Sequence, residues 1–306
     1  MNILVAGGTG FVGRHLVPAL LRRGHRVRVM TRHPGYRADG AVDVEGDVGD
    51  PESLVAAMAD IDAAYYLVHT LDKDDFVERD RVGAINFADQ AARSGVDRIV
   101  YLGGLGNDDD DLSAHLRSRR EVEEILTARV PTVSLRAGIV VGDGSVSWEI
   151  LCQLIERLPL MITPRWVQTK TQPIALDDIV EYLVRALDLE PGGYYEVGAP
   201  ESMTYKQMLQ GAAKLMGRKL HILPVPILTP ALSSHWLRVI TDVDLKTARS
   251  LVDSMTNEVV VTDRRIEDLT GHQPMSFRDA ARIALEARAD RKRRENATDE
   301  PAAISS

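Results

Sequence analysis

The chain has 306 residues, of which 44% are hydrophobic and 27% are charged, as is typical of a globular protein with a sizeable core. The formal net charge of −8 argues against nucleic acid as a partner, because nucleic-acid phosphates are bound by basic surfaces. The single cysteine, Cys152, excludes an internal disulfide framework and a cysteine-based zinc cluster. No apolar run approaches the roughly 18 residues that span a bilayer, so we expect a cytoplasmic protein without membrane insertion.

The chain opens on a short apolar run, residues 2–6, which is followed at once by glycines and then by residues with helical spacing. A strand, a glycine-rich turn and a helix in this order are typical of a loop that binds a dinucleotide. The spacing Gly7-x-x-Gly10-x-x-Gly13 differs from the usual G-x-G-x-x-G, but it still lets the backbone approach a pyrophosphate at the helix N-terminus. The alternative is a glycine-rich turn without a ligand.

Apolar runs and segments of helical spacing then alternate along the chain. The run at 63–68 is continuously apolar, as expected in the middle of a parallel sheet. Strands are expected at 25–30, 42–45, 63–68, 97–102 and 131–136, and helices at 51–59, 74–94 and 112–128. This alternation predicts the α/β class, with a doubly wound parallel sheet and right-handed crossovers.

The remainder of the chain is less regular. We expect helices at 146–158, 177–188 and 204–216, extended segments at 171–175 and 194–197, and a last helix opened by a capping box at 276–279. Prolines exclude a central strand at 222–226, and Asp178 is expected to cap a helix. Several large apolar residues could line a cavity or belong to an ordinary core. They are Trp148, Met161, Trp166, Ile222, Leu228 and Trp236.

Five short stretches carry a family resemblance that covers roughly Met1 to Val261. They are 7–13, 46–48, 99–106, 135–138 with 141–142, and 172–174 with 177–178. Together they resemble an atypical short-chain dehydrogenase/reductase, in the NmrA-like and triphenylmethane-reductase-like branch. The resemblance implies a Rossmann core with the dinucleotide across the carboxyl ends of the strands, and a small C-terminal substrate-binding region.

The resemblance and the element pattern together suggest three parts of the chain. We expect an NAD(P)-binding Rossmann core at 1–145 and a smaller mixed substrate-binding region at 146–290, interleaved with the last elements of the core. Residues 291–306 are charged and then rich in Ala, Pro and Ser, so we expect a disordered tail there.

The residues after the second strand indicate which nucleotide is bound. NAD-selective sites usually place a carboxylate there, but the first one here is Asp39, and Thr31 and Arg32 take its place. A guanidinium binds a 2′-phosphate with two charge-assisted hydrogen bonds, and Arg14 could assist Arg32. We therefore expect NADP(H) to be preferred, with NAD(H) as the alternative, unless these arginines are only solvated surface charges.

Other cofactor contacts follow from the resemblance. Asp47 resembles the family's residue at the adenine amino group, with Val48 against the ring, although Asp47 could also be a simple turn residue. Val68 and His69 are expected near the nicotinamide ribose, although His69 could also be an exposed loop residue. The residues expected to bind the cofactor are Gly7, Thr9, Gly10, Phe11, Val12, Gly13, Arg14, Arg32, Asp47, Val48, Val68, His69, Gly103 and Arg119.

The family's usual catalytic residues are absent. Typical members place a Ser or Thr after the fifth strand and Tyr-x-x-x-Lys on the next helix. Here the strand runs into Leu102-Gly103-Gly104, and the helix carries His115 and Arg119, whose four-residue spacing puts them on one face. These two are our catalytic candidates, unless they are surface residues; no metal-ligand spacing is present.

The exchange of Tyr for His changes the expected chemistry. The cation of Arg119 should lower the pKa of His115 below about 6.5, which leaves a neutral imidazole that is a poor proton donor. We therefore expect hydride transfer to a small apolar or aromatic acceptor, such as a quinone, rather than to a simple ketone. The alternative is an inactive NAD(P)H-binding redox sensor or structural protein of NmrA type, which would bind an effector and a protein partner.

Overall fold

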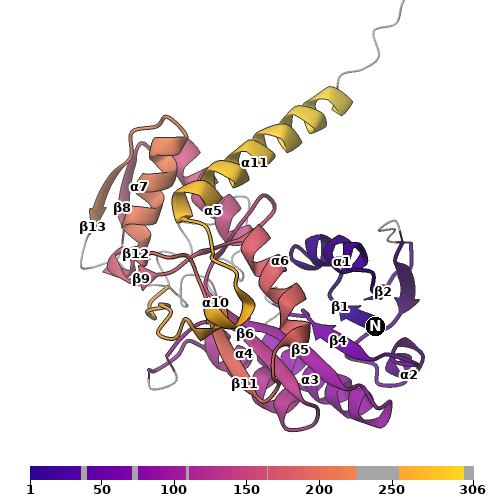
Figure 1. The fold of residues 1–306 in the computed structure, drawn as a ribbon. Coiled ribbons are helices and arrows are strands. Elements are labelled where there is room, and N and C mark those ends of the chain that lie inside the picture. The colour runs from indigo at the N-terminus through magenta and orange to yellow at the C-terminus, as the bar shows by residue number, and fades with distance from the viewer. Residues whose placement is uncertain (36–39, 71–74, 108–109, 164, 225–254, 300–306) are drawn as a thin grey trace, which may run out of the picture.

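The computed structural model describes residues 1–35, 40–70, 75–107, 110–163, 165–224 and 255–299. In this part of the chain, seven parallel strands form one sheet in the order β11-β6-β5-β4-β1-β2-β3 (Figure 1). The strands are β1 (Asn2–Ala6), β2 (Arg26–Thr31), β3 (Val42–Glu45), β4 (Ala63–Tyr66), β5 (Arg98–Gly104), β6 (Thr132–Ala137) and β11 (Gly193–Val197). The expected doubly wound parallel sheet is confirmed, and its order reverses between β1 and β4.

Helices cover both faces of the sheet. Successive side chains of a strand point to opposite faces, so Ile3 and Val5 of β1 join one core, and Leu4 and Ala6 join the other. The first core is closed by α1 (Gly13–Arg22) and α6 (Leu176–Arg185), and the second by α2 (Ser53–Ala57), α3 (Phe76–Arg93) and α4 (Ala114–Thr127). Among the described residues, no helix is long and apolar enough to cross a membrane.

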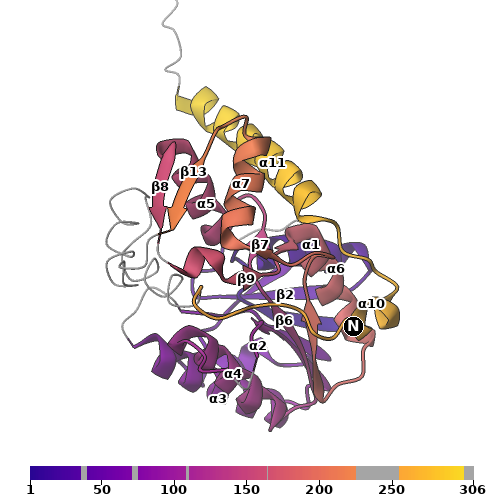
Figure 2. The ribbon, with the colours of Figure 1, turned by 90° about the vertical axis from the view of Figure 1, so that its left-hand side faces the viewer.

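A second region packs around its own core, beside the carboxyl ends of the strands (Figure 2). Its helices are α5 (Val146–Arg157), η1 (Arg165–Gln168), α7 (Tyr205–Leu215) and α11 (Phe277–Asp299), whereas η2 (Ala186–Asp188) and α10 (Arg265–Thr270) contribute to the core that α1 and α6 close. Its short strands pair as β7 (Val140–Val141) with β10 (Ile174–Ala175), β8 (Leu160–Thr163) with β13 (His221–Pro224), and β9 (Lys170–Thr171) with β12 (Met203–Thr204). β13 therefore lies in a two-stranded sheet, in line with the proline-based exclusion of a central strand.

Four of the six large apolar residues that could, from the sequence, line a cavity or belong to a core contribute to the second core. Trp148, Met161 and Ile222 are buried in this core, and Trp166 packs against it. They are thus ordinary core residues, as is the buried Cys152, whose pKa burial raises to about 12. Leu228 and Trp236 lie outside the described residues.

Two expectations about helix termini have different outcomes. The capping box before α11 is confirmed in part: the Asp279 N–H donates to the Ser276 hydroxyl, but the Asp279 carboxylate accepts from that hydroxyl, where a full capping box would use the Ser276 N–H. The expected cap at Asp178 is wrong, since α6 has Ala175 at its N-cap position and no side-chain cap. Asp178 instead accepts bonds from the Met275 N–H and from His272 Nε2, each at 2.9 Å, and so holds the segment before α11.

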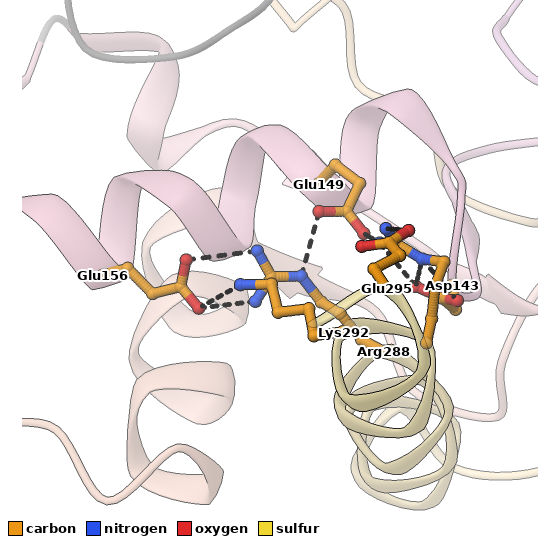
Figure 3. Close-up of polar contacts among 7 residues, drawn as sticks. Asp143, Glu149, Glu156, Arg288, Lys292 and Glu295 are labelled. Atoms are coloured by element: carbon orange, nitrogen blue, oxygen red, sulfur yellow. Dashed lines mark hydrogen bonds and ion pairs between the residues drawn. The ribbon is translucent and has the colours of Figure 1, made fainter. Parts of the chain in front are cut away.

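The expectation of a disordered tail from residue 291 is also wrong over most of its length. α11 continues to Asp299, and its Lys292 lies beside Glu156 of α5 (Figure 3). Arg291 pairs with Asp143 and Glu149, so two basic residues of this segment pair with acidic residues of the second region, whereas Arg293 is exposed and pairs with Asp290 of the same helix. Residues 300–306 lie outside the described residues.

Candidate cofactor and active site

The glycine loop joins β1 to α1 at the carboxyl edge of the sheet. Gly7 has a φ of 83°, and a Cβ there would lie 2.8 Å from the backbone of Leu67. A Cβ on Gly13 would lie 2.3 Å from the Gly7 carbonyl oxygen, so α1 begins directly against the loop. A Cβ on Gly10, by contrast, would have only the Gly7 carbonyl oxygen nearby, at 3.2 Å. Gly7 and Gly13 are therefore required by the fold, whereas Gly10 faces open space.

The open side of this loop fits the pyrophosphate of a dinucleotide. α1 has no side-chain cap at Val12 and no acidic residue in its first turn. The Arg14 N–H already donates to the Gly10 carbonyl oxygen at 3.0 Å, so an anion would be bound by the loop N–H groups between Gly10 and Arg14. Thr9 is exposed, while Phe11 is half-buried. The dipole of α1 adds partial positive charge at the same place.

The arginines expected to bind a 2′-phosphate lie at the ends of elements next to this loop, namely β2, which pairs with β1, and α1. Arg32 is exposed directly after β2, which pairs with β1. Arg14 is exposed in the first turn of α1, with its Nε 3.4 Å from the Gly10 carbonyl oxygen. Both cations remain candidates for the phosphate, and Asp39 lies outside the described residues.

Asp47 is a turn residue, as the alternative interpretation from the sequence expected. Its Oδ1 accepts a bond of 2.8 Å from the Gly49 N–H, and its own N–H donates to Ser53 Oγ at 2.9 Å. Val48 follows and packs against α3, where a Cβ on Gly83 would lie 2.8 Å from it. Contact of either residue with an adenine stays a prediction.

Two histidines and a carboxylate form a hydrogen-bonded relay where β4 and β5 end. His69, just after β4, lies with Nδ1 2.7 Å from Asp80 Oδ2 on α3 and with Nε2 3.2 Å from His115 Nδ1 on α4. Asp80 also accepts bonds from the Thr70 N–H, at 3.0 Å, and from the Ser118 hydroxyl, at 3.4 Å. The side chain of His69 is only 14% exposed, so the alternative of an exposed loop histidine is wrong.

The relay fixes which imidazole nitrogens carry protons. Burial lowers the pKa of His115 well below 6.5, and His69 and Arg119 lower it further. Burial and Arg119 also lower the pKa of His69, and Asp80 only partly opposes this. The direction expected for His115 is confirmed, but burial is the larger cause. With both rings neutral, His69 donates from Nδ1 to Asp80 and His115 donates from Nδ1 to His69, which leaves a lone pair on His115 Nε2.

Arg119 lies one helical turn after His115 and is tied to the end of β5. Its Nη2 donates to the Leu102 carbonyl oxygen at 2.8 Å, and Tyr101 donates to the Arg119 carbonyl oxygen at 3.0 Å. A Cβ on Gly104 would lie 2.9 Å from Leu116 of α4. The helix therefore packs directly on the strand end where typical family members carry a hydroxyl.

Sequence reasoning missed Asp80, Ser118 and Glu123. Glu123 is buried and binds Arg136 of β6, with Oε1 2.7 Å from Nη2. Asp80 carried no local signal, because its partner His69 is separated from it by a loop.

A cavity of about 480 Å³ lies along α3 and α4, and Ser118 lines it. Its other lining residues are Val77, Leu112, Ala114, Arg117, Arg120, Glu121 and Glu124. None of Trp148, Met161, Trp166 and Ile222 lines it, so this cavity is not the apolar substrate cavity that the sequence suggested.

Fold and loop together define a class: a Rossmann-type protein whose glycine loop fits NAD(P)H. In agreement, a family model described as NAD(P)H-binding matches residues 7–133. The chain is also 30% identical over 237 residues to the ceramide reductase of Caulobacter vibrioides, which is 73% of this chain and 73% of that protein. It belongs to the NAD(P)H-binding atypical short-chain dehydrogenase/reductase family.

Two further comparisons agree with this assignment. The chain is 28% identical over 186 residues to the 2-alkyl-3-oxoalkanoate reductase of Stenotrophomonas maltophilia, a match that spans about half of each protein, 52% of this chain and 54% of that one. The structure of an Escherichia coli NADPH-dependent quinone oxidoreductase, complexed with NADPH, aligns with a TM-score of 0.73 at 19% identity. That alignment covers 91% of this chain and 98% of the other, and it is a likeness of fold.

Proposed function

We propose that this protein is an NADP(H)-dependent oxidoreductase that reduces the carbonyl group of an apolar acceptor, with His115 exchanging the proton. The observation that carries the proposal is the Asp80–His69–His115 relay at the carboxyl ends of β4 and β5, beside the glycine loop. When bound, the nicotinamide supplies the hydride.

The cofactor would be held by backbone and by arginines. The N–H groups of the glycine loop and of the first turn of α1 would bind the pyrophosphate, and Arg32 the 2′-phosphate. Arg119 donates one N–H to the Leu102 carbonyl oxygen, and its remaining N–H donors could bind the ribose hydroxyls.

The relay would move a proton at one defined atom, His115 Nε2. In alcohol oxidation, this lone pair accepts the hydroxyl proton, and the resulting positive charge is opposed through His69 by the Asp80 carboxylate. In carbonyl reduction, the same nitrogen returns the proton, so reduction needs a protonated His115. Since the pKa of His115 is lowered well below 6.5, that form is a minor one near neutral pH and becomes more abundant as the pH falls.

The acceptor class rests on two supports. Quinones tolerate reduction without a protein acid, which is why the sequence favoured them. The relay adds a histidine that can donate a proton once it is protonated, which brings ketones into range. The two relatives reported above are named as reductases of ceramide and of a 2-alkyl-3-oxoalkanoate, and the second name describes an alkyl-substituted oxo compound.

The test measures NADPH oxidation with a quinone, an enone and an alkyl-chain ketone, beside a control without acceptor. With the ketone, we expect His115→Phe to lose about 10²–10⁴-fold in kcat, the usual range for general acid catalysis. The wild-type rate should rise from pH 8 to pH 6, and the rise should vanish in His115→Phe. His221→Phe, at an exposed position on β13, is the matched control and should behave as wild type.

Two results would contradict the proposal. Equal ketone turnover by wild type and His115→Phe would remove His115 from the chemistry. Tight NADPH binding without oxidation by any acceptor would favour the NmrA-type sensor instead.

A further inference from the structure

The turn that follows β7 lies against the aromatic residue of the glycine loop. A Cβ on Gly142 would lie 3.1 Å from Cζ of Phe11, and one on Gly144 would lie 3.7 Å from Cδ2 of the same ring. The Ser145 N–H closes the turn by donating to the Gly142 carbonyl oxygen at 3.1 Å. Because Phe11 lies between Gly10 and Gly13, a displacement of this turn would release one side of the loop.

The residue at the centre of the turn, Asp143, is held by α11. Arg291 Nε lies 3.1 and 3.0 Å from the two Asp143 oxygens, and its Nη2 donates to Oδ1 at 3.0 Å. The same Nη2 also binds Glu149 of α5 at 2.8 Å. The Asp143 side chain is only 17% exposed, so solvent screens this pair less than an ordinary surface pair.

Arg288, one turn earlier on α11, makes a similar set of bonds that does not reach the turn. It donates to Glu149 Oε2 at 2.9 Å and to both oxygens of Glu156, at 2.5 and 3.1 Å. Both glutamates belong to α5. The two arginines thus share Glu149, but only Arg291 also holds Asp143.

We propose that Arg291 is a positioning residue for nucleotide binding: through Asp143 it keeps the 142–145 turn against Phe11, and so keeps the glycine loop in its binding conformation. This inference rests on the proposed function, because it takes the glycine loop as the cofactor site. If the turn were released, only a fraction of molecules would hold the loop correctly, and the apparent affinity for the nucleotide would fall to that fraction of its original value.

The experiment measures NADPH affinity by calorimetry on the full chain. Arg291→Ala and Asp143→Ala should each weaken binding by about three- to tenfold. The double variant should be no weaker than either single one, because both remove the same link. Arg288→Ala is the matched control: it should lower the melting temperature at least as much as Arg291→Ala, with NADPH affinity unchanged.

The outcomes separate this inference from the proposed function. Unchanged affinity in folded Arg291→Ala, or an equal loss in Arg288→Ala, would overturn the inference alone. Failure of the wild-type protein to bind NADPH or NADH would overturn the proposed function. If Arg291→Ala does not fold, Asp143→Asn keeps the size of the side chain, removes its charge and should still weaken binding.

Discussion

At the scale of single residues, we expect cofactor choice to depend on Arg32. It is exposed at the end of β2, where an NAD-selective protein would carry a carboxylate. We expect NADPH to bind more tightly than NADH, and Arg32→Ala to remove most of the difference, which is at most a few kcal/mol for a partly exposed pair. Calorimetric titration of both nucleotides measures this; an NADPH preference that survives Arg32→Ala would assign the phosphate to another cation.

Gly10 and Gly13 allow the roles of the loop glycines to be separated. Gly10→Val should abolish nucleotide binding while the protein stays folded, since its side chain would enter the space for the pyrophosphate. Gly13→Val should instead destabilise the fold, because its Cβ would meet the Gly7 carbonyl oxygen. Circular dichroism and calorimetry distinguish the two. Retained affinity in Gly10→Val would mean that the phosphates bind elsewhere.

The candidate site could be predicted from the sequence only where its residues are close in the chain. The positions of His115 and Arg119 followed from helical spacing on one element. The bond between His69 and Asp80 did not, because it joins a strand end to a helix across a loop. The Glu123–Arg136 pair was missed for the same reason: the burial of Glu123 depends on β6, which packs beneath α4.

At the scale of elements, α11 shows the limit of charge patterning. Its basic residues have the composition of a solvated tail, but acidic groups of α5 and of the 142–145 turn pair with them. Those acidic partners lie more than 130 positions earlier in the chain, so no local pattern could indicate them. The strand–turn–helix order at residues 2–22 was predictable because its signals are contiguous.

Deletion of residues 291–306 should therefore lower the melting temperature, by about 2–5 °C if the lost pairs contribute about 1 kcal/mol. Arg293→Ala is a suitable control, since within the described part of the chain that exposed side chain pairs only with Asp290, one turn earlier on the same helix. Differential scanning calorimetry measures both. An unchanged melting temperature after the deletion would restore the view that this segment contributes nothing.

The stabilisation by α11 should also depend on pH. Arg288 lowers the pKa of Glu156 below its ordinary value of 4.5. A carboxylate with a lowered pKa stabilises the folded state above its unfolded pKa, and this contribution is lost as the pH falls through the folded value. Between pH 6 and 8 the Arg288–Glu156 pair should contribute fully.

At the scale of the whole molecule, the parallel sheet and its strand order agree with the family resemblance. The boundary between the two regions was harder to place. α6 and β11 return to the Rossmann core after α5, so the chain leaves the core and re-enters it. Hydrophobic periodicity identifies such elements, but it does not say which of two neighbouring cores each one joins.

The position of β11 has a consequence for how the protein is made. β6 is an internal strand of the finished sheet, but its partner β11 is translated only after residues 138–192. Until then, one side of the strand Thr132–Ala137, which is buried in the finished protein, has unpaired N–H and C=O groups, as at the edge of an aggregating sheet. The nascent chain thus passes through a stage in which its nucleotide-binding half is nearly complete but still open to mispairing.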